Sequence, residues 1–284
     1  MYNKRIIPRL DIKGPNLVKG IHLEGFRVLG KPEDFAKLYY EQGADELIYQ
    51  DTVASLYQRN SLSEIISRTI KDVFIPITVG GGIRSLNDIN KVLRAGADKV
   101  CINTSAINNP EFIKEASREF GSSTIVVAIE VCFEKDEKYL AYTDNGREYT
   151  GVNALEWAKH VEDLGAGEIL LTSIDREGTG EGFDINLYSS LKKILNIPVI
   201  AHGGASNLEH IKEVIKTTNI DAVSIASILH YSAIKQLIER ADSNFLEEGN
   251  IDFLKRKTSF KSFGNEDIVS IKNFLNENQI NVRL

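Results

Sequence analysis

The hydrophobic positions of the chain fall into eight short runs separated by longer segments in which apolar and polar residues alternate with a helical period. Such continuous runs, rich in Val and Ile, are typical of parallel strands that are buried on both faces. We expect strands at residues 6–10, 46–50, 75–79, 99–102, 124–129, 168–172, 197–201 and 222–225. We expect helices at residues 32–43, 61–71, 85–95, 110–121, 153–164, 185–195, 207–216 and 268–277. The alternation of strands and helices predicts an α/β protein with a parallel sheet.

The second half of the chain repeats the first. An apolar run ends in Gly81-Gly82, a helix-type segment follows, and the next run ends in Thr104; Gly203-Gly204 and Ser227 occupy the matching places about 120 positions later. Each copy holds four strands and their helices. The repeat therefore predicts one (β/α)8 TIM barrel domain over residues 1–284, built from half-barrels at about 5–120 and 124–284.

Three segments depart from the repeat. Residues 12–31 contain four glycines and predict a long, mobile loop after the first strand. Residues 134–150 contain alternating positions around Asn145-Gly146, which predicts a β-hairpin after the fifth strand. Residues 232–264 are highly charged and predict an insertion after the eighth strand, either a helix and loop over the barrel mouth or a partner-binding segment.

Composition and charge narrow the class of protein. The 284 residues are 42% hydrophobic and 26% charged, as in ordinary globular domains, and the net charge of −6 disfavours nucleic-acid or membrane-surface binding. No apolar run is long enough for a membrane span or a signal peptide. The two cysteines, Cys101 and Cys132, lie in strand-type runs and predict free thiols in a reducing cytoplasm. We predict no cofactor and no bound metal.

The repeated glycine pairs predict two phosphate sites. Phosphates bind to backbone N–H groups at helix starts and, in barrels of this kind, in loops at the carboxyl ends of the strands. The alternative is a pair of tight turns without a ligand. The residues expected to bind phosphate are Gly82, Asn103 and Thr104 at one site and Gly178, Gly204 and Ser227 at the other.

Two carboxylates also match by the repeat. Asp11 ends the first strand and Glu130 ends the fifth, so they face each other across an eight-strand ring. Opposed carboxylates at a barrel mouth suit general acid–base catalysis. The alternative is a salt bridge to a nearby lysine such as Lys19. A second matched pair, Asp51 and Asp175, favours a structural or substrate-orienting role.

Charged residues also stand at the other ends of the strands. Two bases and two acids lie at or just before the starts of the first, second, fourth and sixth strands, and they are Arg5, Glu46, Lys99 and Glu168. They could form a salt-bridged ring at the bottom of the barrel. Separate surface charges are the alternative.

The sequence blocks resemble those of a known family. The blocks KRIIPRLDIK, ITVGGGIRS, LRAGADKVCINT, GAGEILLTSIDREGT and NQINVRL are similar to the cyclase subunit of imidazole glycerol phosphate synthase, the HisF family. The resemblance implies acid–base catalysis by Asp11 and Glu130, a lysine at Lys19 on a mobile first loop, and a bottom ring that gates an ammonia channel. It implies a glutaminase partner at the bottom face, where Asp98 contributes, and a bisphosphate substrate that is converted to imidazole glycerol phosphate.

Several residues depart from the family pattern. Glu130 stands where the family has aspartate, which predicts weaker ring closure. Arg9 replaces a small residue, and His202 replaces a serine. These features resemble divergent HisF-like paralogues of surface-sugar pathways, which pass ammonia to a third enzyme that builds an acetamidino group. A phosphoribosyl-formimino isomerase and a non-catalytic scaffold that activates a glutaminase are the remaining alternatives.

Overall fold

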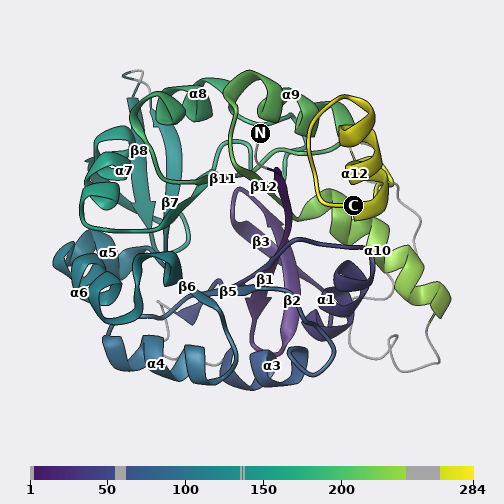
Figure 1. The fold of residues 1–284 in the computed structure, drawn as a ribbon, viewed down its shortest axis with the longest axis horizontal. Coiled ribbons are helices and arrows are strands. Elements are labelled where there is room, and N and C mark those ends of the chain that lie inside the picture. Colours follow the sequence, from purple (N-terminus) through teal and green to yellow (C-terminus); the bar gives the residue numbers. More distant parts are fainter. Residues whose placement is uncertain (1–2, 55–61, 135, 137, 241–262) are drawn as a thin grey trace.

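Eight parallel strands form a closed barrel with helices around it (Figure 1). The computed structural model describes residues 3–54, 62–134, 136, 138–240 and 263–284. In barrel order the strands are β1 (Arg5–Lys13), β4 (Leu47–Asp51), β5 (Ile77–Gly80), β6 (Lys99–Ile102), β7 (Ile125–Glu134), β10 (Glu168–Ser173), β11 (Val199–His202) and β12 (Ala222–Ile225). The barrel closes where β7 pairs with β10. The predicted (β/α)8 fold is confirmed, and each half of the chain supplies four consecutive barrel strands.

Side chains alternate between the barrel lumen and the helix layer along each strand. Ile6 packs outward in the large core shared with the helices, whereas its neighbour Ile7 belongs to a separate interior cluster. The interior cluster is an apolar layer across the lumen, formed by Ile7, Ile48, Cys101, Val126, Ala128, Leu170, Ile200 and Ala222. Below, the mouth is the end of the barrel where the strands end, and the bottom is the end where they begin.

The helices lie close to the predicted segments. They are α1 (Pro32–Glu41), α3 (Leu62–Thr69), α4 (Leu86–Arg94), α6 (Glu111–Phe120), α7 (Ala154–Asp163), α8 (Ile185–Ile194), α9 (Leu208–Thr218) and α12 (Ile268–Glu277). Side chains of Ser85, Asn153 and Asn207 cap α4, α7 and α9 by accepting backbone N–H bonds, which explains where these helices begin. Among the described residues, no helix is both long and apolar enough to cross a membrane.

Among the described residues, two α-helices lie outside the eight predicted helices. A short helix, α5 (Thr104–Asn108), follows β6, and α10 (Ser227–Arg240) follows β12. Because α10 continues to Arg240, the first part of the predicted insertion at 232–264 is helical, and the insertion itself stays a prediction. The rest of that predicted insertion, residues 241–262, lies outside the described residues.

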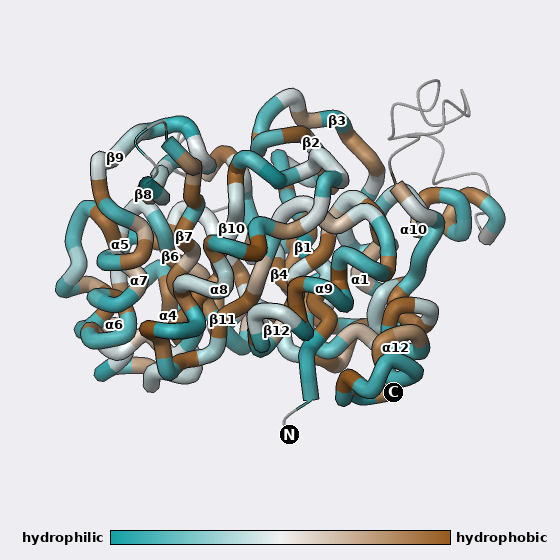
Figure 2. The backbone as a smooth tube through the Cα atoms, turned by 90° about the horizontal axis from the view of Figure 1, so that it is seen from above, coloured by the Kyte–Doolittle hydropathy of each residue, from teal (hydrophilic) through white to brown (hydrophobic). Residues whose placement is uncertain are grey.

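Two antiparallel hairpins extend the barrel at its mouth. The first, β2 (Asn16–Ile21) and β3 (Glu24–Gly30), pairs with β1, so the prediction of a loop over residues 12–31 was wrong. The second, β8 (Lys138–Thr143) and β9 (Glu148–Asn153), confirms the predicted hairpin. Figure 2 shows both hairpins on the same side of the molecule, opposite the N-terminus and α12.

Candidate functional site

The two predicted carboxylates both lie buried at the barrel mouth. Asp11 is fully buried, and Glu130 is 3% exposed. One oxygen of Glu130, Oε2, accepts hydrogen bonds from Asn103 Nδ2 at 3.1 Å and from the Gly146 N–H at 2.8 Å. Burial raises the pKa of Glu130 to about 7, and the charge of Asp11 adds to this, while the Arg9 cation and the Gly146 N–H oppose it. Glu130 can therefore give or take a proton near neutral pH.

Arg9 is paired with the other carboxylate. Its Nε donates to Asp11 Oδ1 at 2.8 Å, and its Nη1 donates to Thr172 Oγ1 at 3.0 Å. Burial opposes the charge of Arg9, but the carboxylates of Asp11 and Glu130 outweigh burial and raise the pKa of the guanidinium. Sequence reasoning had marked Arg9 only as a departure from the family, and its pairing with Asp11 was not predicted.

Lys19 lies in β2, not on a loop, which corrects its predicted setting. Its ammonium donates to the Gly20 carbonyl at 2.7 Å and forms a buried ion pair with Glu177. Glu177 Oε2 also accepts the Leu23 N–H at 3.2 Å, and the Glu177 carbonyl accepts the His22 N–H at 2.9 Å. The loop after β10 thus holds the tip of the first hairpin over the mouth. Glu177 was missed, although its position just after a predicted strand could have indicated it.

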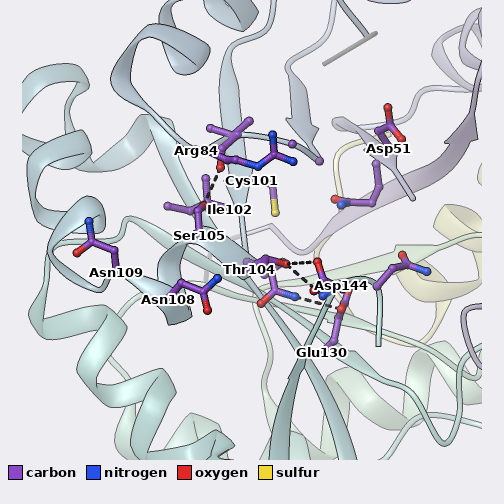
Figure 3. A pocket seen from close by; sticks show the side chains of 17 residues that line it. Asp51, Arg84, Cys101, Ile102, Thr104, Ser105, Asn108, Asn109, Glu130 and Asp144 are labelled. Atoms are coloured by element: carbon purple, nitrogen blue, oxygen red, sulfur yellow. Dashed lines mark hydrogen bonds between the residues drawn. The ribbon is translucent and has the colours of Figure 1, made fainter. Parts of the chain in front are cut away.

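The first predicted phosphate site lies in an open pocket. Gly82, Asn103 and Thr104 line a pocket of about 440 Å³ at the ends of β5, β6 and β7 (Figure 3). Gly81 and Gly82 have φ values of 103° and 71°, and a Cβ atom at Gly81 would stand 2.5 Å from the Asp51 carbonyl oxygen. Glycine is therefore required for this turn.

A carboxylate from the second hairpin reaches the same pocket. The Asp144 N–H donates to Thr104 Oγ1 at 3.1 Å, and Thr104 Oγ1 donates to Asp144 Oδ1 at 3.4 Å. Asp51 and Glu130 also line the pocket, and Arg84 adds a cation. The predicted hydroxyl of Thr104 is thus bonded to an acidic turn, which sequence reasoning did not foresee.

The second predicted phosphate site is nearly filled. The structure brings Gly178, Gly204 and Ser227 together around a space of about 10 Å³, which leaves room for no more than about one water molecule. A Cβ atom at Gly178 would stand 2.6 Å from the Gly20 carbonyl oxygen, so the first hairpin covers this site. The adjoining His202 is neutral because burial and then the Arg9 cation lower its pKa to about 3.

The repeat-matched pair Asp51 and Asp175 is not symmetric. Asp51 Oδ1 accepts the Val53 N–H at 3.0 Å beside the first pocket. Asp175 Oδ2 instead accepts the Phe133 N–H at 2.8 Å, and Asp175 Oδ1 lies 3.3 Å from the Cys132 thiol. Asp175 therefore joins the loop after β10 to β7. In the described part of the chain, no three His, Cys, Asp or Glu side chains are grouped to hold a metal ion.

The four charged residues at the bottom form a closed ring of ion pairs. Arg5 bonds to Glu46 at 2.6 Å and to Glu168. Lys99 bonds to the same two acids, to Glu46 at 3.0 Å and to Glu168 at 3.2 Å. The geometric prediction of a ring is confirmed. Beside it, exposed Asp98 accepts the Ile77 N–H at 2.8 Å, which fixes its carboxylate at the bottom edge.

One lumen thus carries a buried carboxylate pair at its mouth and an ion-pair ring at its bottom, the arrangement of a (β/α)8-barrel enzyme whose chemistry lies at the strand ends. The chain belongs to the family described as histidine biosynthesis protein, whose model matches residues 5–235. This confirms the family resemblance.

Relatives match the chain over nearly their full lengths, and each is named imidazole glycerol phosphate synthase subunit HisF. The protein from Legionella pneumophila is 58% identical over 209 residues, which cover 74% of this chain and 99% of the relative. The one from Hydrogenobaculum sp. is 47% identical over 251 residues, covering 88% and 98%. The one from Methanococcus vannielii is 47% identical, covering 81% and 92%. These similarities support the predicted cyclase-type enzyme and do not favour the isomerase, the scaffold or the sugar-pathway alternative.

Proposed function

We propose that this chain is the cyclase subunit of an imidazole glycerol phosphate synthase. Ammonia from a glutaminase docked at the bottom enters the lumen and reacts at the mouth with N′-phosphoribulosyl-formimino-aminoimidazole-carboxamide ribonucleotide. Imidazole glycerol phosphate forms, and the aminoimidazole carboxamide ribotide is released. The observation that carries this proposal is the closed ring of Arg5, Glu46, Lys99 and Glu168 at one end of a lumen whose other end holds Asp11 and Glu130.

Glu130 and Asp11 divide the acid–base work. Glu130 is the group that exchanges a proton near neutrality, because its pKa is raised to about 7. Asp11 acts as the charged partner, since Arg9 is bonded to it at 2.8 Å. Carboxyl groups whose environments differ in this way can serve as acid and base in one reaction. Lys19 supplies a cation over the mouth.

The two phosphate sites bind the two ends of the substrate. Gly82, Asn103 and Thr104 bind one phosphate in the open pocket. Gly178, Gly204 and Ser227 bind the other only after the β2–β3 hairpin moves, because about 10 Å³ is too small for a phosphate group. Substrate binding is therefore coupled to release of Lys19 from Glu177.

The bottom ring controls entry of ammonia. Each acid of the ring bonds both bases, so a molecule that enters the lumen must displace at least one ion pair. Asp98 lies beside Lys99 at the exposed bottom edge and contributes to docking of the glutaminase.

The test compares two ammonia sources in the complex with the co-expressed glutaminase. We expect the bisphosphate substrate to be converted with either glutamine or ammonium chloride, and Asp11→Asn to lose about 10²-fold or more in both assays. Lys99→Glu places a third acid in the ring, so it should abolish glutamine-supported turnover and weaken co-purification, and ammonium-supported turnover should remain. Unchanged glutamine-supported turnover in Lys99→Glu would contradict the role of the ring.

A second candidate function is supply of ammonia to a third, sugar-modifying enzyme. Asp144 next to Thr104 and the small space at Gly204 favour it, because an acid and a filled site both oppose binding of a bisphosphate. In that case the complex would hydrolyse glutamine, leave the bisphosphate unchanged and release ammonia to the added third enzyme.

A further inference from the structure

The lumen is asymmetric above the bottom ring. The apolar layer crosses the barrel between the ring and the mouth, and six of its eight members have no exposed surface. The two exceptions are Cys101 on β6, 3% exposed, and Ala128 on β7, 6% exposed. Both strands belong to the side of the barrel formed by β4, β5, β6 and β7.

Arg9 fills the opposite side. Its guanidinium reaches from β1 to Thr172 on β10, two strands that β11 and β12 separate in the barrel order. Arg9 is among the largest fully buried side chains, and it is held at 2.8 Å by Asp11 and at 3.0 Å by Thr172. A permanent cation thus spans β1 and β10, on the side of the barrel that also includes β12, the strand of Ala222.

The open pocket at the mouth descends on the side away from Arg9. Besides Gly82 and Thr104, its walls include Cys101 and Ala128, so the pocket reaches down to the apolar layer itself (Figure 3). The strand of Cys101 begins at Lys99, a member of the bottom ring. One strand therefore connects the ring, the apolar layer and the pocket.

The chemistry of this side suits a small uncharged molecule. Burial raises the pKa of the Cys101 thiol to about 12 although the Arg9 cation opposes this, so the thiol stays neutral, and Ala128 offers only a methyl group. An apolar wall disfavours a charged ammonium ion strongly but admits neutral ammonia. On the other side, the Arg9 cation repels ammonium and occupies the space.

We propose that ammonia crosses the apolar layer off the barrel axis, over Cys101 and Ala128, and not past Arg9. This inference rests on the proposed function, because it assumes that ammonia travels from the bottom ring to the mouth. The route makes Ala128 the narrow point: a larger side chain there would fill the passage where it enters the pocket.

The experiment uses the same substitution on the two sides of the layer. In the complex with the glutaminase, product formation from the bisphosphate substrate is measured with glutamine and, separately, with ammonium chloride, which reaches the mouth from solvent. The rate with glutamine divided by the rate with ammonium chloride isolates passage through the layer, because only ammonia made from glutamine has to cross it. Because barrel interiors are close-packed, we expect Ala128→Leu to lower this ratio about tenfold or more, and Ala222→Leu, the matched control, to leave it within about twofold.

The outcomes separate the route from the function. Cys101→Leu should lower the ratio as Ala128→Leu does, and it replaces that variant if thermal melting shows that Ala128→Leu does not fold. If thermal melting shows that Ala222→Leu does not fold, Leu170→Phe replaces it as the control. An unchanged ratio in Ala128→Leu and Cys101→Leu, or an equal fall in the controls, would overturn the off-axis route. If the unaltered complex forms no product with ammonium, the proposed function itself fails, and the route with it.

Discussion

Glu130 illustrates how one residue links burial, hydrogen bonding and proton exchange. Its side chain is longer by one methylene than that of an aspartate, and its Oε2 accepts the Gly146 N–H of the second hairpin at 2.8 Å. The carboxyl group is nonetheless so buried that its neutral and charged forms are about equally populated near pH 7. The hydrogen bonds to Oε2 therefore favour the charged carboxylate, whereas burial of the site disfavours it.

This conflict predicts a pH-dependent stability. The pKa of Glu130 rises from 4.5 to about 7 on folding, so its stabilising contribution is fully present below pH 4.5 and is lost as the pH rises through about 7. Relative to Glu130→Gln, which cannot ionise, the wild-type protein should lose up to about 3 kcal/mol of unfolding free energy across this range. Urea denaturation at several pH values measures the difference. A constant difference between the two proteins would show that Glu130 titrates normally.

Removal of the Arg9 cation is predicted to lower the free energy of unfolding by a large amount. Arg9→Met keeps much of the side-chain volume but leaves Asp11 buried without its cation, since Nε of Arg9 supplies the bond at 2.8 Å. Removal of one partner from a buried ion pair costs about 3–5 kcal/mol. Urea denaturation should show this loss in Arg9→Met, whereas Arg118→Met on the exposed surface should change stability by less than about 0.5 kcal/mol. Equal stability of both variants would contradict a buried pair.

At the level of elements, the apolar runs and the internal repeat were sufficient to predict the barrel, but the glycines of residues 12–31 were misleading. They suggested a loop, whereas Gly14 lies in a turn with φ of 63°, and Gly25, with φ of 64°, lies at the start of β3 directly after the turn of the hairpin. Gly20 lies inside β2, where a Cβ atom would stand 2.0 Å from the Glu24 carbonyl oxygen. Those glycines permit sharp turns and close strand approach, which composition alone cannot distinguish from flexibility.

The candidate site was predictable in position but not in its contacts. The repeat placed Asp11 and Glu130 at strand ends, because strand ends follow from the pattern of apolar runs. Apart from Arg9, which lies two residues from Asp11, the partners of these and neighbouring groups come from distant parts of the chain, and they are fixed only by tertiary packing. Thr172 bonds Arg9, Glu177 bonds Lys19, and Asn145 Nδ2 donates to the Leu23 carbonyl at 3.1 Å.

The contacts of the first hairpin predict how it opens. Glu177→Gln removes the charge that pairs with Lys19 but keeps the size of the side chain, so opening of β2–β3 should become easier by about 1–3 kcal/mol. Amide hydrogen exchange in residues 16–30 should then accelerate roughly tenfold. Glu181→Gln, an exposed acid a few positions later, is the control. Exchange that is equally fast in wild type and Glu177→Gln would indicate that the ion pair does not hold the hairpin.

At the scale of the whole molecule, chemistry and stability lie at opposite ends of the barrel. At the bottom, aspartates just before three strands each accept an N–H at the start of a neighbouring strand: Asp45 from Ile6, Asp98 from Ile77 and Asp221 from Val199, at 2.7 to 2.9 Å. These bonds join neighbouring strands at the bottom of the barrel. The bottom is therefore rigid, and the two hairpins that cover the chemistry lie at the other end (Figure 2).

The C-terminal segment is bonded to the bottom edge of the barrel. Lys272 of α12 is buried, and its ammonium donates to the carbonyls of Gly43 and Arg283 at 2.7 and 2.6 Å and to Asp45 Oδ1 at 2.8 Å. Asp45 in turn accepts the Ile6 N–H of β1. One lysine thus connects the last helix, the chain end and the first two barrel strands.

Lys272→Met should consequently weaken the whole fold and not only α12. The change keeps the aliphatic stem but removes the donor from two part-buried carbonyls and the buried cation from Asp45, which costs about 3–5 kcal/mol. Arg283 Nε, 3.3 Å from Asp45 Oδ1, retains part of the charge compensation, so the loss should lie at the lower end. Lys114→Met, at an exposed i,i+3 pair with Glu111, is the control and should change stability by less than about 0.5 kcal/mol.

Urea denaturation monitored by circular dichroism and by tryptophan fluorescence should show one shifted transition in Lys272→Met. Two separate transitions, with α12 lost first, would mean that the last helix docks independently and that the barrel closes without it.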